Sequence, residues 1–207
     1  MLQEPDYSVA GTIDNTEYDK THADRFTVDG KSITMEEDVQ FAHYDPNVAS
    51  LMQLGKWFDY MRENGVYDNT RIILVADHGR GLYLNWDRVI DNGPDTDFFF
   101  PLLMVKDFNA KGFSFSDTFM TTADVPTLAT SGLIDNPTNP FTGNAINANA
   151  KYDRPFYAFM SYDWDTSKNN GNQFFPGTWY RVDNQNARDK RNWVMVGENT
   201  VLPAALR

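Results

Sequence analysis

The first strong hydrophobic pattern begins after Asp45-Pro46. Apolar side chains recur there every three or four residues, as on one face of a helix; they are Val48, Leu51, Leu54, Phe58 and Met61. Asp is a favoured helix N-cap and Pro suits the first helical position, while Gly65 follows the last apolar residue. The pattern therefore predicts a helix over residues 46–64.

Two apolar runs follow this helix, one at residues 71–76 and one at 101–105. Neither run alternates with polar residues, which is typical of strands that are covered on both faces in a parallel or mixed sheet. A turn at 67–69 leads from the helix into the first run. We expect the two strands to be neighbours or near neighbours in one sheet, with the predicted helix packed on its face.

Turn-forming residues separate the later elements. A short helix at about 123–131 is stopped by Gly132, and a connection rich in Asn, Pro, Thr and Gly spans 135–150. Three runs rich in β-branched and aromatic residues then predict a small antiparallel sheet; they lie at 156–160, 178–182 and 193–196.

The order of these elements predicts an α/β fold in three parts. Residues 1–45 form an irregular lead-in, residues 46–134 an α/β part, and residues 135–207 a small β-rich subdomain. The middle part is expected to hold a site, because open α/β sheets place their ligands at the carboxyl ends of their strands.

Composition narrows the classes of function. The chain has 207 residues, of which 41% are hydrophobic, enough to form a core. Its 18 Lys and Arg against 29 Asp and Glu give a net charge of -11, which argues against a nucleic-acid-binding protein. The sequence has no Cys, so disulfides, thiolate metal sites and cysteine nucleophiles are excluded. No apolar run approaches the roughly 20 residues of a membrane-spanning helix, and the first residues do not resemble a signal peptide.

Asp77-His78-Gly79 stands directly after the first predicted strand. A carboxylate and an imidazole are good ligands for a divalent metal ion, and Gly79 allows the chain to turn sharply. The same three residues also fit a capped turn followed by an ordinary loop histidine, and the motif alone does not separate the two interpretations.

A longer stretch around this motif resembles a known family. Residues 65–79, with the sequence GVYDNTRIILVADHG, resemble the signature of the sulfatase and lipoteichoic-acid-synthase-like members of the alkaline phosphatase superfamily. Phe99–Val105 is similar to the strand that follows in the family, and Thr122–Leu128 is similar to its D-x-x-P-T-L helix. The resemblance covers residues 46–133 and implies a partial alkaline-phosphatase-like mixed sheet with flanking helices.

The resemblance implies a hydrolase or transferase that acts on sulfate or phosphate esters through a metal-activated Thr, Ser or formylglycine. Asp77 and His78 would be ligands of the divalent ion, which is manganese, magnesium, calcium or zinc. The family's nucleophile and a further acidic ligand lie upstream of the matched helix, and this chain has no motif for them. We therefore expect a carboxyl-terminal fragment of the catalytic domain that is inactive alone and binds metal weakly. By the same resemblance, the parent protein is bacterial, membrane-anchored and extracytoplasmic.

Two further residues are candidates for holding the ester. Arg80 follows the implied metal ligands and offers a charged fork to an ester oxygen, although a solvated loop cation fits the sequence equally well. His43 precedes the predicted helix. If this helix returns antiparallel to strand 71–76, it begins near the strand's carboxyl end, and His43 and Tyr44 would border the same cleft. His22 is expected to be an exposed loop residue.

A function of another class stays open. A non-catalytic α/β binding module would use aromatic residues of the last part to hold a glycan or a partner protein; these are Trp164, Phe174, Phe175, Trp179 and Trp193. Core packing explains the same residues and is the favoured interpretation. If part of the parent sheet is absent, an exposed edge is expected to pair with a second copy of the chain. The sequence does not decide between sulfate and phosphate esters, nor does it identify the metal or the acceptor.

Overall fold

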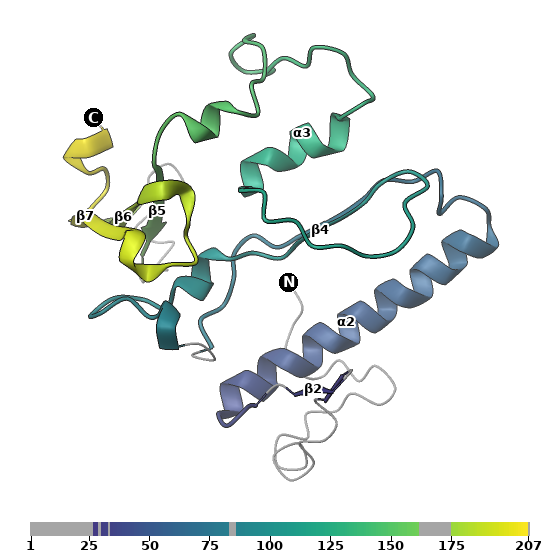
Figure 1. Cartoon of the computed structure of the whole chain (residues 1–207), viewed down its shortest axis with the longest axis horizontal. Coiled ribbons are helices and arrows are strands. Elements are labelled where there is room, and N and C mark those ends of the chain that lie inside the picture. Colours follow the sequence, from purple (N-terminus) through teal and green to yellow (C-terminus); the bar gives the residue numbers. More distant parts are fainter. Residues whose placement is uncertain (1–26, 29, 33, 83–85, 162–174, 207) are drawn as a thin grey trace. The chain divides into compact units, whose positions relative to one another are not determined.

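The computed structural model describes residues 27–28, 30–32, 34–82, 86–161 and 175–206 (Figure 1). The chain divides into two compact units, of which the first comprises Met1–Ile72 and Val105–Gly112 and the second comprises Ile73–Met104 and Phe113–Arg207. The fold is mixed α/β, with helices, two-stranded pairs and a three-stranded antiparallel sheet among the described residues. His22, Trp164 and Phe174 lie outside the described residues.

Helix α2 spans Asp38–Glu63, so the predicted start at residue 46 is wrong. The helix begins earlier because the side chain of Gln40 reaches back to its amino end, where its Oε1 accepts the Glu37 N–H at 3.1 Å. Pro46 lies inside the helix, where it lacks the N–H that would bond to the preceding turn. Residues 38–45 therefore belong to the helix and not to an irregular lead-in. Short strands β1 (Thr27–Val28) and β2 (Lys31–Ser32) precede it as an antiparallel pair.

The apolar stripe of α2 is only partly the predicted one. Met61 is buried, as expected, but Leu51 is half exposed. The other buried apolar side chains of the helix are Phe41 and Ala49, and Phe41 lies in the turn that the sequence pattern had placed before the helix. The core of this unit therefore forms around a longer helix than the spacing of apolar residues predicts.

The two predicted strands are present and are neighbours, as expected. They are β3 (Ile72–Val75) and β4 (Leu103–Lys106), which pair with each other. Their flanking backbone hydrogen bonds join Ala76 to Leu102 and Asp68 to Asn109, so residue numbers rise on one strand as they fall on the other and the pair is antiparallel.

The expectation of strands covered on both faces is wrong. Val75 and Val105 are each 44% exposed. Among the described residues each strand of this pair bonds only to the other, so each keeps an unpaired edge. A continuous apolar run indicated burial on two sides, whereas the two strands of this pair leave some of their apolar side chains in solvent.

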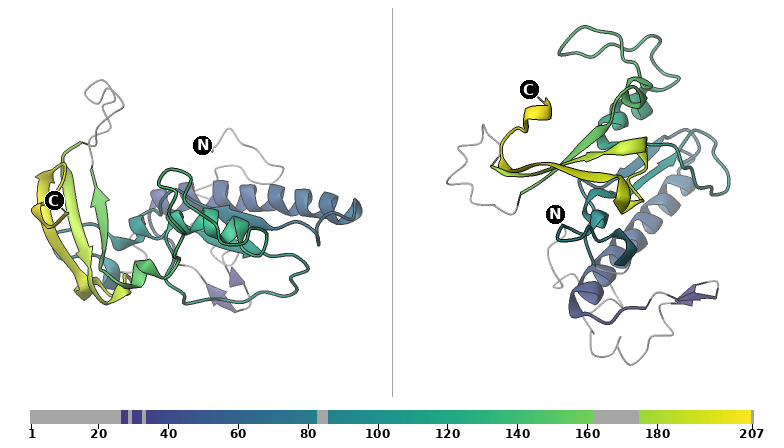
Figure 2. Two further views of the ribbon diagram at one scale, coloured as in Figure 1. Left: turned by 90° about the horizontal axis from the view of Figure 1, so that it is seen from above. Right: turned by 60° about the vertical axis from the view of Figure 1, so that its left-hand side comes forward.

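The remaining predicted elements lie close to their predicted places. A 3-10 turn at Thr122–Asp124 continues into helix α3 (Val125–Thr130), and Gly132 follows with a φ of 71°, as a residue that ends a helix often has. Strands β5 (Phe156–Met160), β6 (Gly177–Val182) and β7 (Trp193–Thr200) form the antiparallel sheet. Figure 2 shows the three strands side by side.

The core of the second unit lies on this sheet. Ala158, Tyr180, Val182 and Trp193 are buried together, one or two from each strand. Ile90, Phe99 and Phe156 pack against them. Trp193 is thus a core residue, which confirms the packing interpretation for this side chain, and its ring contacts Phe99 with centroids 5.0 Å apart.

Candidate functional site

Asp77 and His78 lie on an exposed bend directly after β3. Their side chains are 89% and 61% exposed. The strand ends here because the chain leaves the ladder after the bond between the Ala76 N–H and the Leu102 carbonyl at 3.0 Å. Both side chains are therefore accessible to a ligand from solvent, as the sequence motif requires.

Local hydrogen bonds orient the two side chains. The His78 backbone N–H donates to Asp77 Oδ1 at 2.9 Å, and His78 Nδ1 lies 2.6 Å from the Gly79 carbonyl oxygen. A carbonyl oxygen only accepts, so Nδ1 carries the hydrogen in this bond. The neutral ring then keeps a lone pair on Nε2, which lies 3.8 Å from Asp77 Oδ2.

Gly79 is required by a close backbone approach. Its N–H donates to the Phe98 carbonyl at 2.9 Å. A Cβ at this position would overlap the backbone carbonyl oxygens of Asp97 and Phe100. Gly79 was predicted to allow a sharp turn, but its φ is not among the positive values of the described residues. The glycine instead lets the Asp-His bend lie directly against segment 97–100.

The donor set of the bend fits part of a metal site. A carboxylate oxygen and an imidazole nitrogen with a lone pair are ligands that zinc, manganese and related ions accept. Ligand atoms lie about 2.0–2.3 Å from such ions, so one ion can bridge donors up to about 4 Å apart, and the 3.8 Å between Asp77 Oδ2 and His78 Nε2 is within that limit. No group of three or more potential ligand side chains occurs within the described ranges.

The two predicted ester-binding residues are placed differently. Arg80 is exposed on the same segment as Asp77, with its guanidinium 5.8 Å from the centre of the Phe98 ring. His43 lies inside α2 and belongs to the first unit, whereas Asp77 belongs to the second. His43 was predicted to border the cleft because the helix was expected to begin after it. The helix begins at Asp38, so this reason is wrong. A substrate-binding role for either residue stays a prediction.

Sequence reasoning missed a lysine that holds the turn before β3. The ammonium of Lys106, the last residue of β4, donates to the carbonyl oxygens of Tyr67 and Thr70, the latter at 2.9 Å. It also lies 4.3 Å from the centre of the Tyr67 ring. A charged residue at the end of an apolar run was the only signal for this contact in the sequence.

An ion pair beside this lysine fastens the same turn. Arg71 is 10% exposed and its guanidinium lies 2.9 Å from Asp107. The backbone N–H of Phe108 and the Arg71 guanidinium both donate to the Asp107 carboxylate, and together they hold its pKa below the ordinary value. The turn before β3 is thus joined to the end of β4 by Lys106 and by the ion pair of Arg71 with Asp107.

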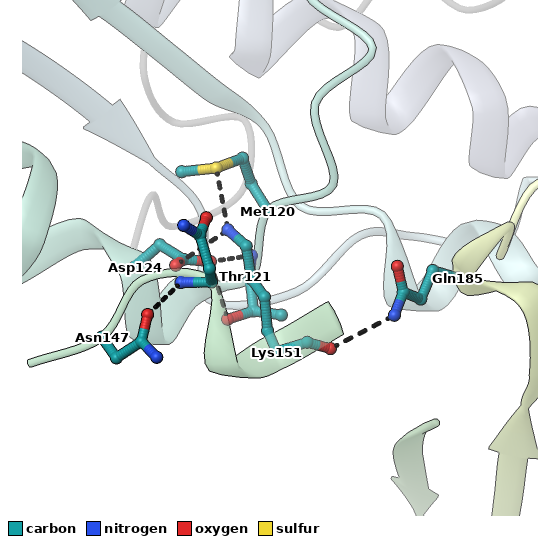
Figure 3. Close-up of polar contacts among 7 residues, drawn as sticks. Met120, Thr121, Asp124, Asn147, Lys151 and Gln185 are labelled. Atoms are coloured by element: carbon teal, nitrogen blue, oxygen red, sulfur yellow. Dashed lines mark hydrogen bonds and ion pairs between the residues drawn. The ribbon is translucent and has the colours of Figure 1, made fainter. Parts of the chain in front are cut away.

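A second ion pair fixes α3 (Figure 3). Lys151 Nζ lies 3.0 Å from Asp124 Oδ1, and these side chains are 17% and 12% exposed. Burial alone would raise the pKa of Asp124, but the Thr121 N–H and the Lys151 ammonium outweigh it and lower that pKa. Asp124 is the acidic residue of the matched D-x-x-P-T-L stretch, and here its side chain closes the capping box of the 3-10 turn before α3 and holds the loop that contains Lys151.

Comparison of the chain with protein-family models, with curated proteins and with solved structures found no match. Among the described residues, no helix combines the length and the apolar character needed to cross a bilayer.

Proposed function

We propose that this chain is the carboxyl-terminal part of the catalytic domain of a metal-dependent enzyme that cleaves or transfers sulfate or phosphate esters. The proposal follows the sequence resemblance to the sulfatase and lipoteichoic-acid-synthase-like members of the alkaline phosphatase superfamily. The parent enzyme is then an extracytoplasmic hydrolase or a phosphoglycerol- or phosphoethanolamine-type transferase.

One observation carries the proposal. Asp77 and His78 follow β3 after Ala76, and their exposed side chains place Asp77 Oδ2 3.8 Å from His78 Nε2. The His78–Gly79 contact orients the imidazole with Nε2 as the ligand atom.

The roles of the chain's own residues follow from this arrangement. Asp77 and His78 hold the ion, Gly79 anchors the bend, and Arg80 offers its guanidinium to an ester oxygen. A bound divalent ion supplies charge neutralisation at the ester oxygens and activation of the nucleophile. The remaining ligands and the nucleophile come, in this proposal, from polypeptide that precedes the matched region in the parent protein.

The exposed apolar surface of the β3–β4 pair supports the proposal that preceding polypeptide completes the site. Val75 and Val105 are each 44% exposed, and each strand has an unpaired edge among the described residues. Further strands of a parent sheet would cover such residues and pair with such an edge. A second copy of this chain is the other occupant that fits an open edge.

The test uses the parent gene. We expect the coding sequence upstream to supply a Thr, Ser or Cys nucleophile, an acidic metal ligand, and a signal or membrane helices. We expect the full-length protein to hydrolyse nitrophenyl phosphate or sulfate. Asp77→Asn or His78→Ala should lower this turnover at least about 100-fold, because each removes a metal ligand.

Asp117→Asn is the matched control, since Asp117 is an exposed carboxylate outside the bend. Full activity in both bend variants would refute the proposal. So would ester turnover by the 207-residue chain alone that disappears in Asp77→Ala, because it would place the nucleophile within this chain.

A further inference from the structure

The loop that joins β6 to β7 forms one wall of an open cleft. The cleft has a volume of about 390 Å³ and combines basic, acidic and amide side chains; they are Asp87, Asn186, Arg188, Asp189, Lys190 and Arg191. This volume lies at the lower end of the range for small-molecule sites. None of the six belongs to the Asp-His-Gly bend, so the cleft is a separate feature.

Two of the three cations among the described lining residues have close partners within the chain. Arg191 forms a two-pronged contact with Asp189, which lowers the pKa of that carboxyl to about 2 through side-chain and backbone hydrogen bonds. Lys190 donates to the Val89 carbonyl at 3.0 Å and to Asp91 at 3.2 Å. These contacts fix the shape of the cleft.

Arg188 is the loosely held cation. Its guanidinium lies 3.4 Å from Asp117, and the two side chains are 66% and 95% exposed. An exposed ion pair with this separation contributes little energy, so the guanidinium can exchange Asp117 for a ligand at low cost. Arg188 therefore brings a planar, two-pronged donor to the cleft that a bound anion can use.

The loop is built to hold one conformation. Asn184 and Gln185 both have a positive φ, at 57° and 52°, which is uncommon for residues other than glycine. Gln185 Nε2 donates to the Tyr152 carbonyl at 2.8 Å and approaches the Lys151 carbonyl, a contact that Figure 3 shows. The Trp193 indole N–H donates to the Ala187 carbonyl at 2.8 Å. A braced loop loses little conformational entropy when a ligand binds.

The chemistry of the lining selects the class of ligand. Carboxylates beside the cations disfavour a ligand with several anionic groups, such as a polyphosphate, but together with the Asn186 amide they suit hydroxyl groups, which both donate and accept. None of the six described lining residues is aromatic, so none of them offers a ring on which a nucleotide base would stack. We propose that this cleft binds a small sugar that carries one phosphate, sulfate or carboxylate group, with Arg188 on the anionic group.

Amide chemical shifts of the isotope-labelled chain test the proposal during titration with glucose 6-phosphate, glucose 6-sulfate and glucuronate. At least one should produce saturable shifts in residues 183–192, whereas glucose should not. Arg188→Gln should weaken this binding about tenfold or more, because it removes one charge-assisted contact. Arg188→Lys should restore only part of the loss, since an ammonium lacks the fork.

Lys111→Gln is the matched control, because it removes one exposed positive charge elsewhere and should leave binding unchanged. Three results would overturn the proposal: no saturable shift in the loop with any of the three sugars, equal binding by Arg188→Gln, or equal binding by inorganic phosphate. The last result would show an adventitious ion only. Arg188 is exposed, so the variant is expected to fold, and unchanged shifts outside the loop would verify this.

Discussion

Replacing Lys106 by Met tests how the turn before β3 is held. The Lys106 ammonium is partly buried and donates to backbone carbonyls of Tyr67 and Thr70, while the Asp68 carbonyl lies 3.4 Å away. Methionine keeps the length and apolar stem of the side chain but removes the charge and the donors. The change therefore isolates the polar part of the contact.

The expected loss of stability is about 2 kcal/mol. A hydrogen bond from a charged donor contributes about 1.5–3 kcal/mol when it is shielded, and the cation–aromatic contact with Tyr67 adds about 0.5–1 kcal/mol. Because water can reach the freed carbonyls in part, we count one such hydrogen bond; the sum is then about 2–4 kcal/mol, and its lower end applies. For a chain of this size each kcal/mol corresponds to about 2–4 °C in Tm, so Lys106→Met should melt about 4–8 °C lower.

Lys111→Met is the control, because Lys111 contacts the same turn through Asp68 at 3.1 Å but is 77% exposed. It should cost no more than about 0.5 kcal/mol. Urea unfolding of both variants gives the comparison, and hydrogen exchange adds a local measurement at the Asn109 amide, which donates to the Asp68 carbonyl. Equal stability of the two variants, with unchanged protection at Asn109, would refute the role given to Lys106.

Two further predictions concern the bend and the α3 ion pair. Gly79→Ala should destabilise the chain by about 2–4 kcal/mol in thermal unfolding, because its Cβ overlaps backbone carbonyls, whereas Gly55→Ala in open space on α2 should stabilise it by about 0.5–1 kcal/mol. Because the pKa of Asp124 is lowered in the folded chain, the ionised carboxylate contributes its full stabilisation of the fold above the ordinary carboxyl pKa. This stabilisation is lost as the pH falls through the lowered pKa. The stability difference between wild type and Asp124→Asn should therefore be constant above about pH 5 and shrink below about pH 4, as measured by urea unfolding; a difference independent of pH would contradict the ion pair.

Helix α2 shows how far local patterns predict the fold. Its end and the two strands after it follow from apolar spacing and turn residues, and the structure has them within one or two residues. The start of the helix does not follow from the pattern, because Asp45-Pro46 looks like the beginning of a helix. The actual first turn depends on the Gln40 side chain, which accepts the Glu37 N–H. A proline tolerated within a helix cannot be told from one that begins it by sequence pattern alone.

The candidate site is predictable in part for a related reason. Asp77 and His78 are neighbours in sequence, so their placement on one bend follows from the motif and the strand before it. The contact between Gly79 and segment 97–100 joins residues about twenty positions apart, and no local pattern specifies it. The same holds for Lys106 and for the cleft around Arg188, which bring distant segments together through single charged side chains.

The most direct test of the central claim is Mn²⁺ binding at the Asp-His bend. Paramagnetic broadening of amide signals should concentrate at residues 77–80 at millimolar Mn²⁺, because two ligands leave most of the coordination shell to water and give weak affinity. Asp77→Asn and His78→Ala should each abolish this broadening, whereas Asp117→Asn should leave it in place. Broadening spread evenly over exposed carboxylates, or unchanged at the bend in both variants, would contradict the assignment of Asp77 and His78 as metal ligands.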